Sequence, residues 1–410
     1  MRTTWRWPRD HDESDLIVSE MDEVIPALVA AVQEQHATGD HYRDDAIRQA
    51  MEHQAQLALR PGPVRVDVIV DPPWSDGQIN SVQVVTGDRP FLVDTVVSCL
   101  LRHGWRVEDV RHPIIGVKRD RGTIEAVGTT GRGGCASESW IHIDVTAPLG
   151  TDIGQAAEQL RDDLCACLDQ VVCATDDWGA MHEAMLRTAE LVSASSGPAD
   201  DRDSSRELLE WLADGHFIFL SYPEFAVDGE TMTPVAGTHL GIAEEGPRFD
   251  AVPHNDDKAT VIVTKDSVRS AVQRNGYRDY IGVRIRDEHG AVVAEHRFLG
   301  LLGSAAYTES VAHIPVLRAK ASRILALSGY RANSHSGKAV VRTIAEFPRD
   351  DFFEASAEEL VPLIMAIVDL REKQRLRALV RRGPWGRFFH LLVFVPADRF
   401  DARTLGLVEG

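Results

Sequence analysis

The hydrophobic pattern of this chain changes its period at one short turn near residue 88. Apolar residues alternate over 79–86, as in a strand, and recur at helical spacing over 90–103. Between them, Gly87 can take φ > 0, Asp88 can cap the following helix, and Pro90 suits a first helical turn because its missing N–H costs nothing there. We therefore predict a strand, a tight turn and a helix whose free N–H groups can face an anion.

The composition is that of a multidomain globular protein. The chain has 410 residues, 44% of them hydrophobic and 26% charged, so we expect roughly two to four domains with cores of their own. No apolar run approaches the ~20 residues of a membrane helix, and the N-terminus lacks the apolar core of a signal peptide. The odd number of cysteines, five, favours a reducing, cytoplasmic location without disulfides or a metal site.

The charge distribution argues against nucleic acid as a partner. The net charge is −19, and because residues 315–410 carry 16 Lys+Arg against 11 Asp+Glu, the preceding 314 residues hold −24. Such an acidic body would repel a phosphate backbone. One basic cluster is interpreted as the solvated face and C-terminal end of a long helix, with an RNA patch as the alternative: Arg371, Lys373, Arg375, Arg377, Arg381 and Arg382.

The first half of the chain is predicted to hold helices followed by an α+β block. In order, we expect two short helices within 13–60, strands at 64–70 and 79–86, a helix over 90–103, strands at 105–118, 123–128 and 138–146, and a helix over 152–168. This β-α-β-β-α order is one strand short of a complete unit. Residues 170–173 could supply that strand, and a helix continuing to Trp178 is the alternative.

Residues 193–206 are small, polar and acidic, which is typical of a linker or an exposed loop. After them we predict a helix at 207–212, mostly antiparallel strands at 217–220, 259–264, 281–286 and 291–299, and helices at 315–328, 337–346 and 356–381. Residues 385–410 then repeat the strand–turn pattern of 84–90. A strand and half a helix cannot bury their own apolar faces, so we expect a further module cut short and a chain that is a fragment.

Several sequence blocks, spread over nearly the whole chain in one order, resemble a single family. They are Asp88–Val96, His112–Ile114 with Arg119, Asp120 and Gly122, Glu138–Ile143, Trp211–Leu212 with Phe217–Leu220, Arg297–Leu302, Ile314–Arg318 with Lys320, Ser334–Lys338, Phe347–Phe353, and Val395–Pro396 with Asp398–Phe400. The stretch around Asp88 is similar to the signature of ACT domains. The set as a whole is similar to the N-terminal part of the large bacterial NAD-dependent glutamate dehydrogenases.

The resemblance implies an α+β fold in six parts. These are N-terminal helices at 1–63, an ACT-like (ferredoxin-like βαββαβ) domain at 64–178, a helix and linker at 179–206, a PAS-like α+β domain at 207–313, a helical segment at 314–384, and the truncated start of a second ACT-like domain at 385–410. In that family such modules precede a Rossmann-type catalytic domain. This chain is thus expected to cover only the regulatory first part.

The implied function is regulation and assembly rather than catalysis. Full-length members convert L-glutamate, NAD and water to 2-oxoglutarate, ammonia and NADH, whereas we expect no catalytic residues, cofactor or metal in this part. Expected partners are a second copy of the chain, the downstream catalytic domain and an amino-acid effector, with neither nucleic acid nor membrane. The alternative is a stand-alone amino-acid sensor that acts on a partner protein.

The residues proposed to bind an effector gather at the turn: Gly87, Asp88, Arg89, Pro90, Asp94 and His112. Asp94 is interpreted either as a surface residue of a helix or as a partner for Arg89 or an effector's amine. Amino-acid-binding ACT domains commonly have glycine directly after the Arg-Pro pair. Here that place is Phe91, whose side chain would fill the space.

Three further patterns favour structural roles. His112 and His142 are interpreted as polar residues on the solvent face of a sheet, with a metal or pH-sensing pair as the alternative. The glycines between 128 and 134 lack the spacing of a dinucleotide loop and favour a flexible β-hairpin. The segment 334–338 resembles a phosphate loop only in its Gly-Lys pair, and a helix cap is the better interpretation.

Overall fold

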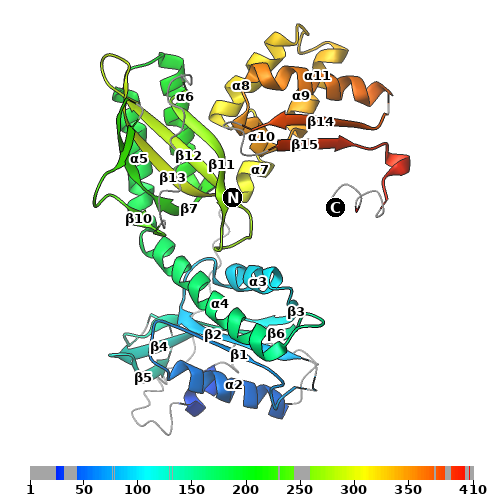
Figure 1. Cartoon of the computed structure of the whole chain (residues 1–410). Helices are drawn as coiled ribbons and strands as arrows, with labels where there is room; N and C mark the ends of the chain where they lie inside the picture. The colour runs from blue at the N-terminus through cyan, green and yellow to red at the C-terminus, as the bar shows by residue number, and fades with distance from the viewer. Residues whose placement is uncertain are drawn as a thin grey trace, which may run out of the picture. The chain divides into compact units, whose positions relative to one another are not determined.

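The computed structural model of this chain describes residues 25–31, 44–75, 77, 79–128, 130, 131, 133–229, 231–243, 259–373, 375–383, 389–401 and 406. The chain divides into two compact units, each described by itself below (Figure 1). Unit 1 comprises residues 1–172 and 271–275, and unit 2 comprises residues 173–270 and 276–410. The expected helical positions before residue 25 and the expected turn positions after residue 401, apart from 406, lie outside the described residues.

Unit 1 is built on a six-stranded antiparallel sheet. Its strands are β1 (Val64–Ile69), β2 (Asn80–Gly87), β3 (Arg106–Arg111), β4 (Ile114–Asp120), β5 (Thr123–Gly128) and β6 (Ala136–Thr146). They lie in the order β1-β2-β6-β4-β5, and β3 pairs with β6 beyond the end of β4. The expected strand 105–118 is thus interrupted at Pro113, which has no N–H to donate to a ladder.

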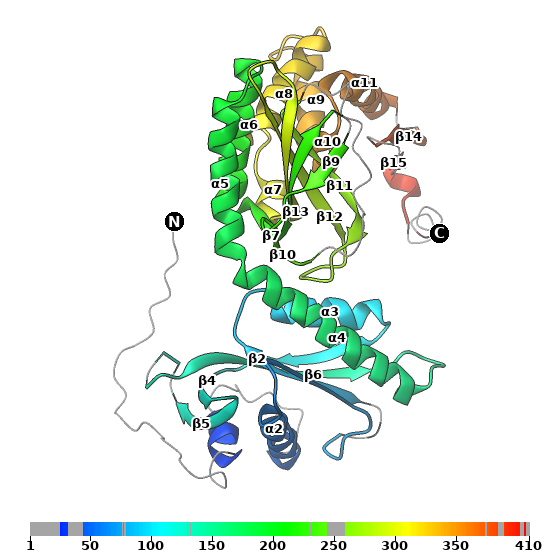
Figure 2. The same cartoon turned by 60° about the vertical axis from the view of Figure 1, so that its left-hand side comes forward.

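Helices cover both faces of this sheet (Figure 2). The helices α3 (Leu92–Arg102) and α4 (Ile153–Asp176) lie on one face, and α2 (Asp44–Ala58) lies on the other. The core under α2 also includes residues of a short helix over 25–31 and side chains of the sheet, such as Val85 and Trp140. The expected helices and most of the expected strands are therefore confirmed.

The strand expected at 170–173 is wrong, because these residues continue α4 as the alternative had it. Buried Leu164, Leu168 and Val171 keep helical spacing through this segment, so burial of one helical face extends α4 to Asp176. The sheet edge beside β2 is instead occupied by β1, which comes from the N-terminal side.

The glycine-rich segment after β5 is not a hairpin. It leads from β5 to β6, and these two strands do not pair, because β4 lies between them. Three glycines there, at 131, 133 and 134, have positive φ of 77, 58 and 81°. The prediction of a β-hairpin is wrong because local composition specifies a turn but not which strand receives the chain afterwards.

Unit 2 contains a seven-stranded antiparallel sheet. Its strands are β7 (Phe217–Tyr222), β8 (Glu224–Asp228), β9 (Thr231–Pro234), β10 (Leu240–Gly241), β11 (Val261–Arg269), β12 (Tyr277–Arg286) and β13 (Val292–Leu302). The order is β10-β7-β13-β12-β11, with β8 pairing with both β13 and β9. The helices α5 (Trp178–Ala194) and α6 (Ala199–Trp211) precede the sheet, and a π-helical turn, Leu212–His216, leads into β7. Mixed α+β architecture with antiparallel sheets is thus confirmed.

The expected linker at 193–206 is only four residues long. Residues 199–206 form the first half of α6, with Pro198 at its N-cap and the acidic side chains of Asp200 and Asp201 in its first turn. Carboxylates stabilise a helix N-terminus through the helix dipole. The acidic composition that suggests a loop therefore favours a helix start here.

The C-terminal part of unit 2 packs helices into the same core as the sheet. These helices are α7 (Ser304–Thr308), α8 (Pro315–Leu327), α9 (His335–Glu346), α10 (Arg349–Glu354) and α11 (Ala357–Lys373). A two-stranded ribbon follows, β14 (Arg377–Arg382) and β15 (Phe389–Phe394), then a 3-10 turn, Ala397–Arg399. The Ser334 hydroxyl accepts a hydrogen bond from Gly337 N (3.0 Å), so the predicted helix cap is confirmed.

The helix predicted over 356–381 is wrong in its last part, because residues 377–382 form β14. Leu379 and Arg381 are buried while Ala378, Val380 and Arg382 are exposed, a period of two. The basic cluster is consequently not the end of one helix, and Arg381 is not solvated. Among the described residues, no helix is both long and apolar enough to cross a membrane.

Candidate functional site

The turn between β2 and α3 has a different backbone from the one expected. The left-handed residue is Phe91, with φ 72° and ψ 2°, and Gly87 is not among the residues with positive φ. Phe91 is also the N-cap of α3, so Pro90 precedes the helix and Asp88 does not cap it. Since only glycine adopts this conformation without strain, Phe91 occupies the position that glycine suits best.

Two of the proposed site residues, Asp88 and His112, are both hydrogen-bonded to Ser139. The Ser139 hydroxyl on β6 donates to Asp88 Oδ1 (2.6 Å) and accepts from His112 Nε2 (2.9 Å), which fixes the tautomer of the imidazole. Ser139 is fully buried, and burial lowers the pKa of His112, with the Asp88 carboxylate opposing. The chain Asp88–Ser139–His112 therefore fastens the turn to the sheet, and its hydroxyl is not placed to attack a substrate.

Arg89 and Asp94 point away from these three hydrogen-bonded residues. Arg89 reaches α4, where its Nη1 donates to Val172 O (3.4 Å). Asp94 is exposed in the first turn of α3, where a carboxylate favours the helix dipole. The interpretation of Asp94 as a surface residue fits its exposure.

His142 is neither on a solvent face nor bonded to His112. It is buried on the face covered by α2, where it accepts from Gln83 Nε2 (3.1 Å) and donates through Nε2 to Asp144 Oδ1 (3.1 Å). Arg111 donates to the second oxygen of Asp144 (3.1 Å). The prediction of a solvent face is wrong for His142, because α2 comes from outside the β-α-β-β-α unit and covers that face. His112 is exposed, as predicted.

The conformation of Phe91 makes a testable prediction. Phe91→Gly and Phe91→Ala both remove the aromatic side chain, but only glycine also removes the strain of a left-handed residue. We expect Phe91→Gly to be more stable than Phe91→Ala by about 1 kcal/mol, measured by urea unfolding. Equal stabilities would contradict a left-handed Phe91.

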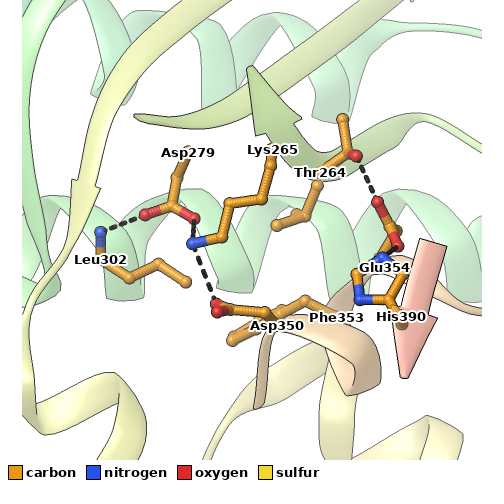
Figure 3. A pocket seen from close by; sticks show the side chains of 9 residues that line it. Thr264, Lys265, Asp279, Leu302, Asp350, Phe353, Glu354 and His390 are labelled. Atoms are coloured by element: carbon orange, nitrogen blue, oxygen red, sulfur yellow. Dashed lines mark hydrogen bonds and ion pairs between the residues drawn. The ribbon is translucent and has the colours of Figure 1, made fainter. Parts of the chain in front are cut away.

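A second group of polar residues surrounds a cavity of about 10 Å³ in unit 2, room for roughly one water molecule (Figure 3). Lys265 Nζ on β11 contacts Asp279 Oδ1 on β12 (2.7 Å) and Asp350 Oδ1 on α10 (3.1 Å). Tyr307 OH also donates to Asp350 (3.0 Å), and Leu302 N donates to Asp279 (2.7 Å). Burial alone would lower the pKa of Lys265, but the carboxylates of Asp279 and Asp350 raise it above its usual value. Lys265 therefore stays cationic.

The ribbon β14–β15 contributes His390 to the lining of the same cavity. Arg381 and His390 are cross-strand partners, and both contact Asp351 and Glu354 on α10. His390 Nδ1 lies 3.0 Å from Asp351 Oδ1, and its Nε2 lies 2.7 Å from Glu354 Oε2. Arg381 Nη2 donates to Asp351 (2.7 Å) and also pairs with Glu354.

Asp351, Glu354 and His390 lie close enough together to be considered as metal ligands. However, the guanidinium of Arg381 already contacts both carboxylates, so a cation would have to displace it. Two carboxylates facing an arginine and an imidazole form a buried ion-pair cluster. The arrangement fits a structural closure between α10 and the ribbon better than a metal centre.

Lys320 is partly buried beside this cluster and satisfies the end of α10. Its Nζ donates to the carbonyl oxygens of Phe352 (2.7 Å), Phe353 (2.9 Å) and Ala355 (2.6 Å). Burial lowers the pKa of Lys320 to about 8, with Glu359 opposing the shift and Arg381 adding to it. An ammonium with three donors matches three helix-end carbonyls.

The lowered pKa gives a pH prediction with a definite sign. Between pH 8 and about 10.4 the unfolded chain keeps the Lys320 proton that the folded chain loses, so this group makes the protein more stable as pH rises. We expect the free energy of unfolding of the wild type, relative to Lys320→Met, to increase by up to about 3 kcal/mol over that window. A difference that stays constant from pH 7 to 10.5 would contradict it.

Sequence reasoning did not assemble this second group, although part of it was visible. Lys320, Asp350 and Asp351 all lie in blocks that resemble the family, and Arg381 lies in the basic cluster. The partners Lys265 and His390 carry no local signal, since Lys265 is one of several polar residues of β11 and His390 is a single polar residue within apolar β15. Their meeting depends on the packing of β11, α10 and β15.

Comparisons with known proteins agree with these observations. Residues 28–164 match the family model of the ACT1 domain of glutamate dehydrogenase, and residues 314–373 match that of its helical motif 1. The chain is 30% identical over 343 residues to the NAD-specific glutamate dehydrogenase of Pseudomonas aeruginosa, an alignment covering 79% of this chain and 21% of that protein.

Two further relatives carry the same name. Identity is 30% to the NAD-specific glutamate dehydrogenase of Halomonas elongata, covering 78% of this chain and 21% of that protein. It is 27% to that of Mycobacterium tuberculosis, covering 78% and 20%. The aligned part of this chain thus spans about a fifth of the length of these relatives.

Proposed function

Because this chain belongs to the NAD-specific glutamate dehydrogenase family, as an N-terminal part of it, we propose that it is a regulatory and assembly region. The full-length protein would oxidise L-glutamate with NAD and water to 2-oxoglutarate, ammonia and NADH, and this region would not itself carry out that reaction. The observation that carries the proposal is the ACT1 match over 28–164, which coincides with the sheet of unit 1.

The geometry of the turn favours assembly over effector binding at this place. Asp88 is engaged by Ser139, Arg89 by the backbone of α4, and Phe91 takes the conformation that would suit a glycine. An effector would have to compete for these groups. The outer sheet edges at β1 and β5, by contrast, each have one unpaired side within the sheet order, and such edges pair readily with another chain.

We also propose that the β14–β15 ribbon begins a second ACT-like module that continues in the longer relatives. Three apolar side chains on one face of the ribbon are well exposed, Val380 (60%), Phe389 (71%) and Leu391 (55%). An isolated two-stranded ribbon is at best marginally stable, and further strands or a helix would cover this face. We likewise propose that residues 207–313, which hold the seven-stranded sheet, form a PAS-like domain.

Light scattering of the purified chain over a concentration series tests the assembly role. We expect a dimer or a larger species that dissociates on dilution. A strict monomer at the highest concentration would contradict assembly through this region. In the same preparation, glutamate and NAD are expected to give no NADH absorbance, and a glutamate-dependent increase would contradict a purely regulatory role.

Calorimetry with the twenty amino acids separates this proposal from the alternative of a stand-alone sensor. We expect no saturable heat for the wild type, because Asp88 and Arg89 are already engaged by Ser139 and α4. Phe91→Gly is the matched variant, since it opens the turn and leaves Asp88 and Arg89 in place. Saturable binding by the wild type would favour the sensor and would place Gly87, Asp88, Arg89, Pro90, Asp94 and His112 back in consideration as effector ligands.

A further inference from the structure

Two buried cysteines meet between the helices that cover one face of the unit 1 sheet. Cys99 on α3 is 1% exposed and Cys167 on α4 is 3% exposed, and all five cysteines of the chain are free thiols. Arg102 Nη2 lies 3.5 Å from Cys99 Sγ and 3.3 Å from Cys167 Sγ. Both sulfur atoms therefore lie beside the same guanidinium nitrogen.

This arrangement makes the two thiols unequal. The neighbouring Cys99 thiol and the Arg102 guanidinium lower the pKa of Cys167 to about 6, against burial and the Asp163 carboxylate. The neighbouring Cys167 sulfur and burial raise the pKa of Cys99. Asp163 is itself held by His103, whose Nε2 lies 2.7 Å from Asp163 Oδ2. At neutral pH one sulfur is a thiolate and its neighbour remains a thiol, which is the division of roles in a reactive dithiol.

We propose that Cys167 and Cys99 form a peroxide-reactive dithiol that closes to a disulfide between α3 and α4. The oxidant class follows from the burial, because a small neutral peroxide can reach a sulfur that a bulky disulfide cannot. Arg102 is exposed and lies against both sulfur atoms, so the approach runs past its side chain. This site does not depend on the function proposed above.

The chemistry balances in two steps. The Cys167 thiolate attacks one oxygen of hydrogen peroxide, the S–O bond forms as the O–O bond breaks, and the departing hydroxide takes a proton to leave as water. Cys99 then attacks the sulfenic sulfur, the S–S bond forms as the S–O bond breaks, and the second hydroxide leaves as water with the Cys99 proton. The two thiols lose two electrons in total, and the peroxide gains them.

The disulfide would restrict the movement of α3 relative to α4. Cys99 lies two turns after Phe91 on α3, the helix that starts at the β2–α3 turn. A disulfide would tie this helix to α4, which Arg89 already contacts at Val172. Oxidation would therefore fix the position of the turn relative to α4.

Peptide mapping of the whole chain after peroxide treatment at pH 7 tests the proposal. Free thiols are blocked with iodoacetamide, and peptides are analysed without reduction. We expect Cys99 and Cys167 peptides linked with the loss of two hydrogens, reversed by dithiothreitol, and formed about tenfold faster than an ordinary cysteine is oxidised. Exposed Cys173 serves as the internal comparison in the same sample. Oxidation of Cys173 first, with Cys99 and Cys167 still open to alkylation after unfolding, would overturn the proposal.

Three variants assign the roles. Cys99→Ser should stop at the sulfenic acid, so dimedone labels Cys167 and no linked peptide forms. Cys167→Ser should protect Cys99 from oxidation, and Arg102→Gln should slow disulfide formation several-fold. Cys165→Ser is the matched control, because Cys165 is on the same helix and burial raises the pKa of its thiol. If Arg102→Gln formed the disulfide at the wild-type rate and dimedone labelled Cys99, Cys167 would not be the sulfur that attacks peroxide, and the proposal would be overturned.

Discussion

Replacing Arg381 by methionine is expected to destabilise the chain by about 3–5 kcal/mol. Arg381 contacts both Asp351 and Glu354, whose side chains are only 9% and 2% exposed. Without the guanidinium, these two carboxylates remain buried beside the His390 imidazole. Removing one member of a buried ion-pair group leaves an uncompensated charge, and this costs much more than the net contribution of the intact group.

Urea unfolding and hydrogen exchange of the β14 amides would measure this effect. Arg382→Met is the matched control, because Arg382 is the next residue of the same strand and points to the exposed face, so its stability should change by no more than about 0.5 kcal/mol. Adding Asp351→Asn and Glu354→Gln to Arg381→Met should recover much of the loss, since the buried charges are then gone. Similar stabilities of Arg381→Met and Arg382→Met would refute the cluster as a fastening of the ribbon to α10.

Replacing Glu295 by glutamine is expected to have a comparable effect on the sheet of unit 2, about 3–5 kcal/mol. Glu295 on β13 is fully buried and accepts from Arg297 Nε (2.6 Å) and Tyr280 OH (2.5 Å). Arg284 Nε, also fully buried, lies 3.7 Å from its second oxygen. An amide keeps the shape of the carboxylate but loses the negative charge between two guanidinium groups.

The neighbouring tyrosine remains a donor in the wild type. Burial, followed by the Glu295 carboxylate, raises the pKa of Tyr280 well above its usual range.

Glu288→Gln is a suitable control because its side chain is 87% exposed in the β12–β13 turn, and we expect a change within about 0.5 kcal/mol. The triple variant Glu295→Leu, Arg284→Met and Arg297→Met should be far more stable than Glu295→Gln, since apolar residues of similar volume replace the charges. Equal unfolding midpoints for Glu295→Gln and Glu288→Gln would count against this reasoning.

The β2–α3 turn illustrates how far local sequence reasoning extends. The strand, the turn and the helix were predictable because their hydrophobic periods are properties of neighbouring residues. The turn's internal bonds were not, because Ser139 reaches Asp88 from β6, some fifty residues further along the chain. Gly87 was assigned the left-handed conformation that Phe91 holds, and Asp88 was assigned a helix cap, whereas its carboxylate accepts from Ser139. A local pattern does not say which residue takes the left-handed conformation or which side chain arrives from elsewhere.

The basic cluster is a second illustration. Arg377, Arg381 and Arg382 continue the charge pattern of α11 closely enough to suggest one helix. The strand forms instead because Leu379 and Arg381 are buried on the same side, and Arg381 finds two carboxylates there. A buried charge depends on its partner, and the partner lies about thirty residues away.

The sequence by itself determined the α+β class, most helices and strands, and the family, because periodicity, turn residues and ordered motifs are written along the chain. Only the tertiary structure decided that β1 supplies the edge strand, that α2 buries the second face of the sheet, and that Cys99 and Cys167 lie beside one arginine. It also decided the surroundings of Lys265. These outcomes share one physical reason: burial and charge pairing are contacts between distant segments, and their free energy has no local signature.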